Sequence, residues 1–176
     1  PGERMDGFRC GDPIVDAWAA TRASRARERG TAIVYVTRCG DDIAGFYSLS
    51  THSVAREEVS GGWFRRNAPS QVPAILLGML GVDERYQGMG LGAQLLRDAN
   101  ALKVSELAGA RALVVDPTGE TASAFYRRFG FSDLPSTTRM VLRLILPTAR
   151  QQRNVCVLNL ASFNWERGGA KCIFKG

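Results

Sequence analysis

Histidine is nearly absent from this chain, since His52 is the only one among 176 residues. The four cysteines, Cys10, Cys39, Cys156 and Cys172, lie far apart and form no CxxC pair. Because zinc sites are built from clustered cysteine and histidine side chains, we expect no metal site. Scattered thiols are instead typical of a cytoplasmic protein, in which they stay reduced.

Long hydrophobic runs are also missing. No stretch reaches the roughly 18 apolar residues of a membrane span, and the first residues do not resemble a secretory signal. Hydrophobic residues make up 45% and charged residues 23% of the chain, as in soluble globular proteins. A chain of this length can build one domain with a real core.

Lysine is scarce, and its distribution separates the C-terminal end from the rest. Only Lys103 lies in the body of the chain, whereas Lys171 and Lys175 fall in its last six residues. The net charge is +6, and residues 147–176 contribute most of it. We therefore expect one domain over residues 1–146 and a tail of unknown role over 147–176, either an extra strand near residues 155–158 or disordered.

Apart from Lys103, the basic residues of the body of the chain are arginines, and several of them are clustered. The longest is Arg22, Arg25, Arg27 and Arg29, which surround the single acid Glu28. Shorter pairs occur at residues 65–66 and 127–128. Because the charge of the body as a whole is modest, any binding of nucleic acid would depend on such local patches.

Hydrophobic periodicity and turn residues predict a mixed α/β fold. A helix is expected first, then a hairpin, a strand, a helix, a strand, a helix and a last strand. The expected ranges are 13–29, 32–38 with 43–51, 74–82, 93–107, 112–115, 121–129 and 140–146.

The most informative segment joins the expected strand 74–82 to the helix that follows it. Gly88, Gly90 and Gly92 occupy every second position where that helix begins. Glycines leave backbone N–H groups uncovered, and a helix start carries unpaired donors and partial positive charge. This arrangement favours a phosphate-bearing ligand bound by the N–H groups of residues 87–92.

Several phosphate sites are compatible with these glycines. The residues from Gly88 to Ala93 match the dinucleotide pattern GxGxxA, with Asp116 as the ribose-binding acid. However, five polar residues separate the glycines from the strand, and too little chain follows for a dinucleotide domain. A P-loop is excluded because no GK[ST] follows, and a glycine-rich turn without ligand is the remaining alternative.

A further pattern involves two motifs in order. Residues 85–90 read R-x-x-G-x-G, which resembles the acetyl-CoA signature of the GNAT acetyltransferase superfamily. Residues 125–131 read FYxxxGF, which resembles the segment near the end of the same domain. The resemblance implies an acyl-CoA N-acyltransferase fold with a splayed central strand, and acetyl-CoA as co-substrate.

The N-terminal residues narrow this resemblance to one branch. Phe8-x-Cys10-Gly11, Asp16-x-Trp18 and the VDERYQG version of the glycine segment are similar to the toxin branch of the superfamily. The resemblance extends over about residues 8–146. It implies acetylation of the amino group of aminoacyl-tRNA, a ribbon-helix-helix antitoxin as partner, and a possible homodimer.

The resemblance also implies which residues carry the reaction. Tyr126 would be the general acid that protonates the leaving thiolate, although a tyrosine packed on the core is the alternative reading. Backbone groups at the end of the strand would bind pantetheine, and the glycine segment would bind the pyrophosphate. The implied cofactor-binding residues are Leu80, Gly81, Val82, Gln87, Gly88, Met89, Gly90, Leu91 and Gly92.

Contacts to tRNA are expected from exposed arginines and one aromatic residue. Trp63, Arg65 and Arg66 could stack on and pair with the acceptor end, and Arg22 and Arg25 could contact phosphates. The alternatives are a loop tryptophan that covers the core and a helix face that is merely solvated. No general base stands out; the candidates are Glu57, Glu58, Asp116 and His52.

Three functions remain open at this point. The leading one is a toxin that blocks translation by acetylating charged tRNA. The second is a GNAT enzyme for a small amine or a protein N-terminus, which would share Tyr126. The third is a non-catalytic module that binds acyl-CoA, in which Tyr126→Phe would change nothing.

Overall fold

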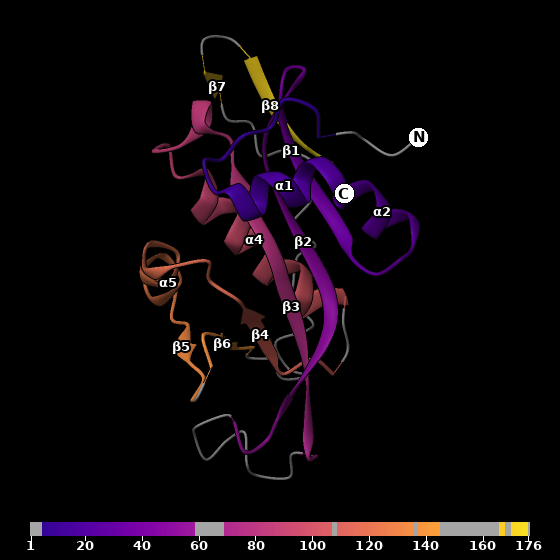
Figure 1. Ribbon diagram of the computed structural model, residues 1–176, viewed down its shortest axis with the longest axis vertical. Coiled ribbons are helices and arrows are strands. Elements are labelled where there is room, and N and C mark those ends of the chain that lie inside the picture. The colour runs from indigo at the N-terminus through magenta and orange to yellow at the C-terminus, as the bar shows by residue number, and fades with distance from the viewer. Residues whose placement is uncertain are drawn as a thin grey trace. The chain divides into compact units, whose positions relative to one another are not determined.

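The computed structural model describes residues 5–58, 69–106, 109–135, 137–144, 166–167 and 170–175. For residues 101–106 and those after 165 it describes the backbone alone. The chain divides into two compact units, and Figure 1 labels the helices and strands that make them up. The first contains Pro1–Leu49, Met79–Ala99 and Pro147–Gly176, and the second contains Ser50–Gly78 and Asn100–Leu146.

The first unit begins with two helices where the sequence predicts one. Helix α1 spans Pro13–Thr21 and helix α2 spans Ala23–Glu28, with a break at Arg22. The expected cap is confirmed, because Asp12 accepts hydrogen bonds from the N–H groups of Ile14 and Val15. The break follows Thr21, whose hydroxyl donates to the Ala17 carbonyl at 2.7 Å. Such bonds bend helices because they draw on a carbonyl that the helix itself uses.

The expected hairpin is confirmed, and its second strand is longer than predicted. Strand β1 spans Ile33–Cys39 and pairs antiparallel with strand β2, Asp42–Ala55. The other side of β1 pairs antiparallel with strand β8, Ala170–Lys175, which itself pairs with β7, Glu166–Arg167. Part of the tail thus covers the edge of β1, while residues 155–158 lie outside the described residues.

Helices cover both faces of the hairpin. Alternate residues of a strand face opposite sides, so Val34, Val36 and Phe46 meet α1 in a buried cluster with Val15 and Ala19. On the other face lies the start of α4, Leu91–Glu106. Its Asp98 accepts a hydrogen bond from the buried hydroxyl of Tyr47 at 2.5 Å, which links this helix to β2.

The second unit is organised around strand β4, Ala112–Val115, whose four residues are all buried. It pairs antiparallel with β6, Met140–Arg143, which pairs with the short β5, Ser132–Asp133. Helix α5, Glu120–Arg127, connects β4 to this pair. The core of the unit is aliphatic and comprises Val54, Val72, Ala74, Ala112, Val114, Leu134 and Val141.

The parallel ladder of the central strand ends early. Strand β3 spans Gln71–Val82, but β4 pairs only with its residues Ala74–Leu77. The strand order is β5-β6-β4-β3-β2-β1-β8-β7, and only the β3–β4 pair is parallel among the registers described. The mixed α/β class is as predicted, and the predicted splay of the central strand is consistent with the end of the β3–β4 ladder at Leu77. None of the helices in the described part of the chain is long and apolar enough to cross a membrane.

Candidate active site

The glycine segment lies in the first unit, between β3 and α4. It follows a single 3-10 turn, η1, Glu84–Tyr86. Gly88 and Gly90 have φ angles of 74° and 81°, a left-handed conformation that favours glycine. A Cβ atom at either position would meet nothing within 4 Å, and the first turn of α4 contains no acidic residue. This geometry suits an anion at residues 88–92, which stays a prediction, whereas the Gln87 N–H already donates to the Glu84 carbonyl at 3.4 Å.

Alanine at these glycines tests whether the backbone conformation is required. Because the space is open, we expect a cost of about 1 kcal/mol per site from the positive φ alone. Gly88→Ala and Gly90→Ala should lower the unfolding free energy and weaken acetyl-CoA binding measured by calorimetry. Gly119→Ala is the control, because its φ is 177° and a Cβ there also meets nothing. Equal behaviour of the three variants would contradict this role of the loop conformation.

A buried carboxylate anchors the segment. The Asp83 side chain is only 3% exposed and lies directly before η1. It accepts hydrogen bonds from the N–H groups of Arg9 and Arg85, both at 3.1 Å, and from the Arg85 guanidinium. Burial alone would raise its pKa, but these bonds outweigh burial and lower the pKa of Asp83. The carboxylate is therefore ionised and joins the N-terminal segment to the loop.

Arg85 has a structural partner on each side. Its Nη1 lies 2.8 Å from Asp42 and its Nε lies 2.7 Å from Asp83. From the sequence, Arg85 or Arg97 could contribute charge beside the phosphates. In the structure the guanidinium of Arg85 is committed to two carboxylates, so it holds the loop in shape, while Arg97 is exposed on α4.

The N-terminal motif packs against the same loop. The Gln87 side chain donates to the carbonyls of Cys10 and Val82, at 2.8 and 2.9 Å. Asp16 accepts from the Cys10 N–H at 2.7 Å. The Cys10 thiol is half-buried, and burial raises its pKa to about 12, so it stays protonated. The F-x-C-G and D-x-W residues therefore have structural roles.

The end of β3 contains the predicted pantetheine-binding residues. Leu80 and Val82 are half-buried and Gly81 is buried. A Cβ at Gly81 would lie 3.0 Å from side-chain atoms of Phe8 and Val15. The sequence suggests that this glycine lets a ligand approach, whereas the structure explains it by close packing against the core. Met89, in the loop, is half-buried, as are Leu91 and Gly92 in the first turn of α4.

Tyr126 lies on α5 in the second unit. It is 8% exposed and packs against the rings of Phe125 and Phe131, each 5.3 Å away between centroids. Burial raises the pKa of Tyr126 to about 12. Among the residues that the structure describes, none forms a hydrogen bond with its hydroxyl.

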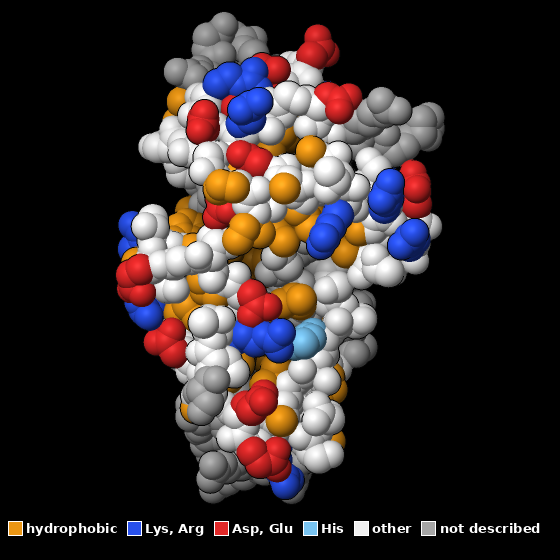
Figure 2. Space-filling model, viewed as in Figure 1, with side chains coloured by type: hydrophobic (Ala, Val, Ile, Leu, Met, Phe, Trp, Pro, Cys, Tyr) orange, Lys and Arg blue, Asp and Glu red, His pale blue; other side chains and the backbone are white. Residues whose placement is uncertain are grey.

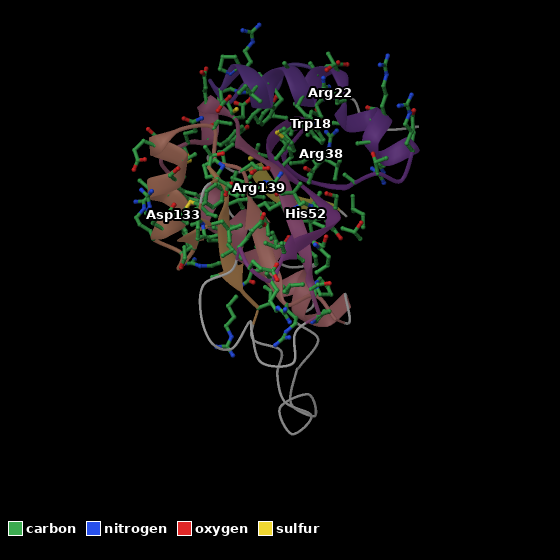
Figure 3. All side chains as sticks on the ribbon, turned by 60° about the horizontal axis from the view of Figure 1, so that its bottom comes forward. Trp18, Arg22, Arg38, His52, Asp133 and Arg139 are labelled. Atoms are coloured by element: carbon green, nitrogen blue, oxygen red, sulfur yellow. The ribbon has the colours of Figure 1, made fainter. Side chains whose placement is uncertain are left out.

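The predicted tRNA contacts are placed only in part. Trp63, Arg65 and Arg66 lie outside the described residues. Arg22 and Arg25 are exposed at the junction of α1 and α2, and Figure 3 shows Arg22 near Trp18. In the described ranges neither arginine forms an ion pair. Trp18 itself stacks on Phe46 at 5.8 Å and belongs to the core face.

One polar cluster was not predicted. In the second unit, Arg139 contacts both Asp116 and His52, two residues that the sequence offers separately as bases. Arg139 carries no sequence signal, because it is an isolated basic residue before β6. Only the antiparallel pairing of β4 with β6 brings it beside Asp116.

Comparison with known proteins shows the family of the chain. Residues 30–133 match the model of the acetyltransferase (GNAT) domain. The chain is 38% identical to a tRNA-acetylating toxin of Mycobacterium tuberculosis, over 83% of this chain and 88% of that protein. It is 30% identical to a probable toxin TacT of Sinorhizobium fredii, over 81% of this chain and 83% of the relative.

Solved structures share the fold at lower identity. A tyrosine-to-phenylalanine mutant of KacT superposes with a TM-score of 0.74 at 22% identity, covering 80% of this chain and 87% of that one. AtaT complexed with acetyl-methionyl-tRNAfMet gives a TM-score of 0.72 at 22% identity, covering 79% and 86%. The chain therefore belongs to the GNAT acetyltransferase family, in the branch that includes the tRNA-acetylating toxins.

Proposed function

We propose that this protein transfers the acetyl group of acetyl-CoA to the amino group of aminoacyl-tRNA and so blocks translation. The observation that carries the proposal is the 38% identity to a tRNA-acetylating toxin along most of both chains. A solved relative, AtaT, is complexed with acetyl-methionyl-tRNAfMet, and another structure contains AtaTR bound with AcCoA.

The first unit supplies groups that fit the phosphates of acetyl-CoA. Gly88 and Gly90 turn the backbone so that successive N–H groups precede α4, and no carboxylate of the first helical turn opposes an anion. Asp83 and Arg85 hold this loop in place. Leu80, Gly81 and Val82 provide backbone groups at the end of β3 for the pantetheine arm, and one of their N–H groups would polarise the acetyl carbonyl.

Tyr126 is the candidate proton donor. During transfer the amine nitrogen bonds to the acetyl carbon, the carbon–sulfur bond breaks, and sulfur leaves as a thiolate. We assign protonation of this thiolate to Tyr126, whose raised pKa keeps the phenol intact in neutral solution. An aminoacyl ester amine is less basic than lysine, so a dedicated general base is not required.

The exposed arginines favour a polyanionic substrate. Arg22, Arg25, Arg27 and Arg29 are all exposed around α2, which would repel a cationic amine and attract phosphates. This observation supports tRNA over a polyamine. A small-molecule amine or a protein N-terminus remains the second candidate, and a non-catalytic acyl-CoA module the third.

Neutralising two of these arginines should weaken tRNA binding in a salt-dependent way. We expect the Arg22→Gln/Arg25→Gln double variant to raise KM for charged tRNA severalfold and to reduce the slope of log KM against log salt by about 1.5. Glu28→Gln, on the same helix, should change KM in the opposite direction. Kinetics at several salt concentrations measure both effects, and an unchanged slope would remove this helix from the tRNA interface.

A direct assay tests the proposal as a whole. Charged tRNA pools incubated with labelled acetyl-CoA should acquire label on the aminoacyl group only when the protein is present. Label on a small amine or a protein N-terminus, with none on tRNA, would favour the second candidate. Binding of acetyl-CoA without any transfer would favour the third.

The proposal includes a partner and a compartment. AtaT has been solved bound to the C-terminus of the antitoxin AtaR. We propose a corresponding ribbon-helix-helix antitoxin for this protein, and the cytoplasm, where charged tRNA is found, as its site of action. Homodimer formation and the role of residues 147–176 stay predictions, which size measurements with and without the tail would test.

A further inference from the structure

Three polar side chains from segments far apart in the sequence meet in the second unit. His52 belongs to β2, Asp116 directly follows β4, and Arg139 directly precedes β6. The Arg139 Nε lies 2.9 Å from Asp116 Oδ1, and its Nη1 lies 3.3 Å from His52 Nε2. The side chains of Arg139 and Asp116 are 42% and 43% exposed, so solvent and ligands can reach them. Figure 3 shows His52 and Arg139 side by side, and Figure 2 shows the only histidine against a blue side chain on the surface.

The contact with arginine defines the state of His52. A guanidinium can only donate hydrogen bonds, so His52 Nε2 must accept, and the ring proton must be on Nδ1. Burial and the charge of Arg139 lower the pKa of His52, while Asp116 and Glu58 act in the opposite direction. The imidazole is thus neutral with its basic nitrogen occupied, which argues against His52 as the general base.

Asp116 keeps one oxygen available. Its Oδ1 pairs with Arg139, and among the described residues nothing donates to its Oδ2. The residue lies at the carboxyl end of a parallel strand, the end at which α/β proteins bind ligands. It also opens the connection from β4 to α5, the helix that contains Tyr126.

We propose that Asp116 Oδ2 accepts a hydrogen bond from the acceptor amino group, with Arg139 and His52 as its positioning residues. This inference rests on the proposed function, because it deepens the description of the same site. It concerns binding of the amine and adds no covalent step.

Charge compensation makes the arrangement suitable for a nucleophile. An isolated carboxylate would stabilise the ammonium form, which has no lone pair and cannot attack. Asp116 paired with Arg139 presents an acceptor without a net charge. A neutral amine can donate one N–H to it and point its lone pair elsewhere. His52 fills the other arm of Arg139 and so prevents the guanidinium from turning away.

The experiment compares Asp116→Asn with a matched control in the same unit. Asp133 also pairs with an arginine, Arg127, at 3.4 Å, so Asp133→Asn removes an equivalent exposed charge. In D116N the amide oxygen would still accept from Arg139. The NH₂ group, in the place of Oδ2, can only donate, so it would occupy the lone pair that the amine needs for attack. We expect kcat/KM for charged tRNA to fall about ten- to hundredfold in D116N. D133N should match the wild type, and both variants should keep the acetyl-CoA Kd and the melting temperature.

The outcomes are distinguishable. Wild-type protein that does not acetylate charged tRNA contradicts the proposed function, and the inference with it. Active wild-type protein with D116N equal to D133N overturns the inference alone. If D116N melts markedly earlier, Asp116→Ser replaces it, because a small neutral side chain at this exposed position retains no carboxylate and tests the same contact.

The pH profile of activity gives a second test, because it depends on the titration of His52 and would not change if His52 only supported the fold. Protonation of His52 would set an N–H against the Arg139 donor and release the guanidinium. Gln at this position can still accept through its oxygen but does not titrate. We expect His52→Gln to lose a smaller fraction of its own activity at about pH 7.5 than the wild type does as the pH falls below the ordinary His range. Parallel pH profiles on the same substrate would show that His52 does not position Arg139.

Discussion

Replacing Tyr126 by phenylalanine is expected to lower the rate of acetyl transfer by about 10²- to 10⁴-fold, the usual contribution of a general acid. Tyr126 is 8% exposed and packed between aromatic rings, so phenylalanine fits the same space. Its hydroxyl has no hydrogen-bond partner among the described residues, and its removal should leave the fold and the acetyl-CoA Kd unchanged. Single-turnover transfer to charged tRNA and calorimetric titration of acetyl-CoA measure the two quantities.

Tyr35→Phe serves as the control for loss of a tyrosine hydroxyl elsewhere. Tyr35 lies on β1, where it stacks on Tyr47 at 4.9 Å, and should keep full transfer activity. If Tyr126→Phe also keeps full activity, the protein is either a binding module or protonates the thiolate by another route. In the toxin case, the inactive variant should also relieve growth arrest on expression.

The pH dependence of Tyr126 follows from its burial. Burial disfavours the phenolate and raises the pKa of Tyr126 to about 12. The phenol therefore keeps its proton throughout neutral and mildly alkaline solution. We expect transfer to show no alkaline decline from this residue in the range where the fold is stable.

Asp83→Ala should lower the free energy of unfolding by about 3 kcal/mol. The side chain is 3% exposed, and its removal leaves the N–H groups of Arg9 and Arg85 without their acceptor. The same change frees the loop that precedes α4, so acetyl-CoA binding should weaken together with stability. Urea unfolding and calorimetric titration measure both effects.

Asp42→Ala is the matched control, because its carboxylate pairs with the same guanidinium but is 48% exposed. Exposed pairs contribute little, but the removal of Asp42 also leaves the buried Tyr86 hydroxyl without this acceptor, so we expect a loss of about 1 to 2 kcal/mol, smaller than that of Asp83→Ala. Because the pKa of Asp83 is lowered on folding, its contribution is present above the ordinary value of 3.8 and is lost as the pH falls through the folded value. Equal losses in both variants at neutral pH would contradict the role of Asp83 as an anchor.

Where residues close together in the sequence set the structure, local patterns predicted the helices and strands correctly. Asp12 and Pro13 begin α1 as expected, and the apolar run before the glycines forms β3. The break at Arg22 was missed, because the apolar periodicity continues across it. Strand β5 was also missed, since two residues carry no periodic signal.

The roles of individual site residues depended on contacts between distant segments. Gly81 has no room for a side chain because Phe8 and Val15 pack directly over it. No local pattern in the sequence shows this contact. Arg85 belongs to the family motif, yet its guanidinium pairs with Asp42, more than forty positions earlier in the chain. The contact between His52 and Arg139 spans 87 positions and was equally invisible.

The sequence by itself determined the family, the glycine turn before α4 and the tyrosine of α5, because spacing along the chain encodes backbone conformation and helix position. Only the tertiary structure decided which charges are already paired. Ion pairs join residues that strand pairing brings together, and the distribution of charge in the sequence does not reveal them. For that reason Arg85 becomes a support for the loop, and Asp116 with Arg139 becomes the candidate site for the amine.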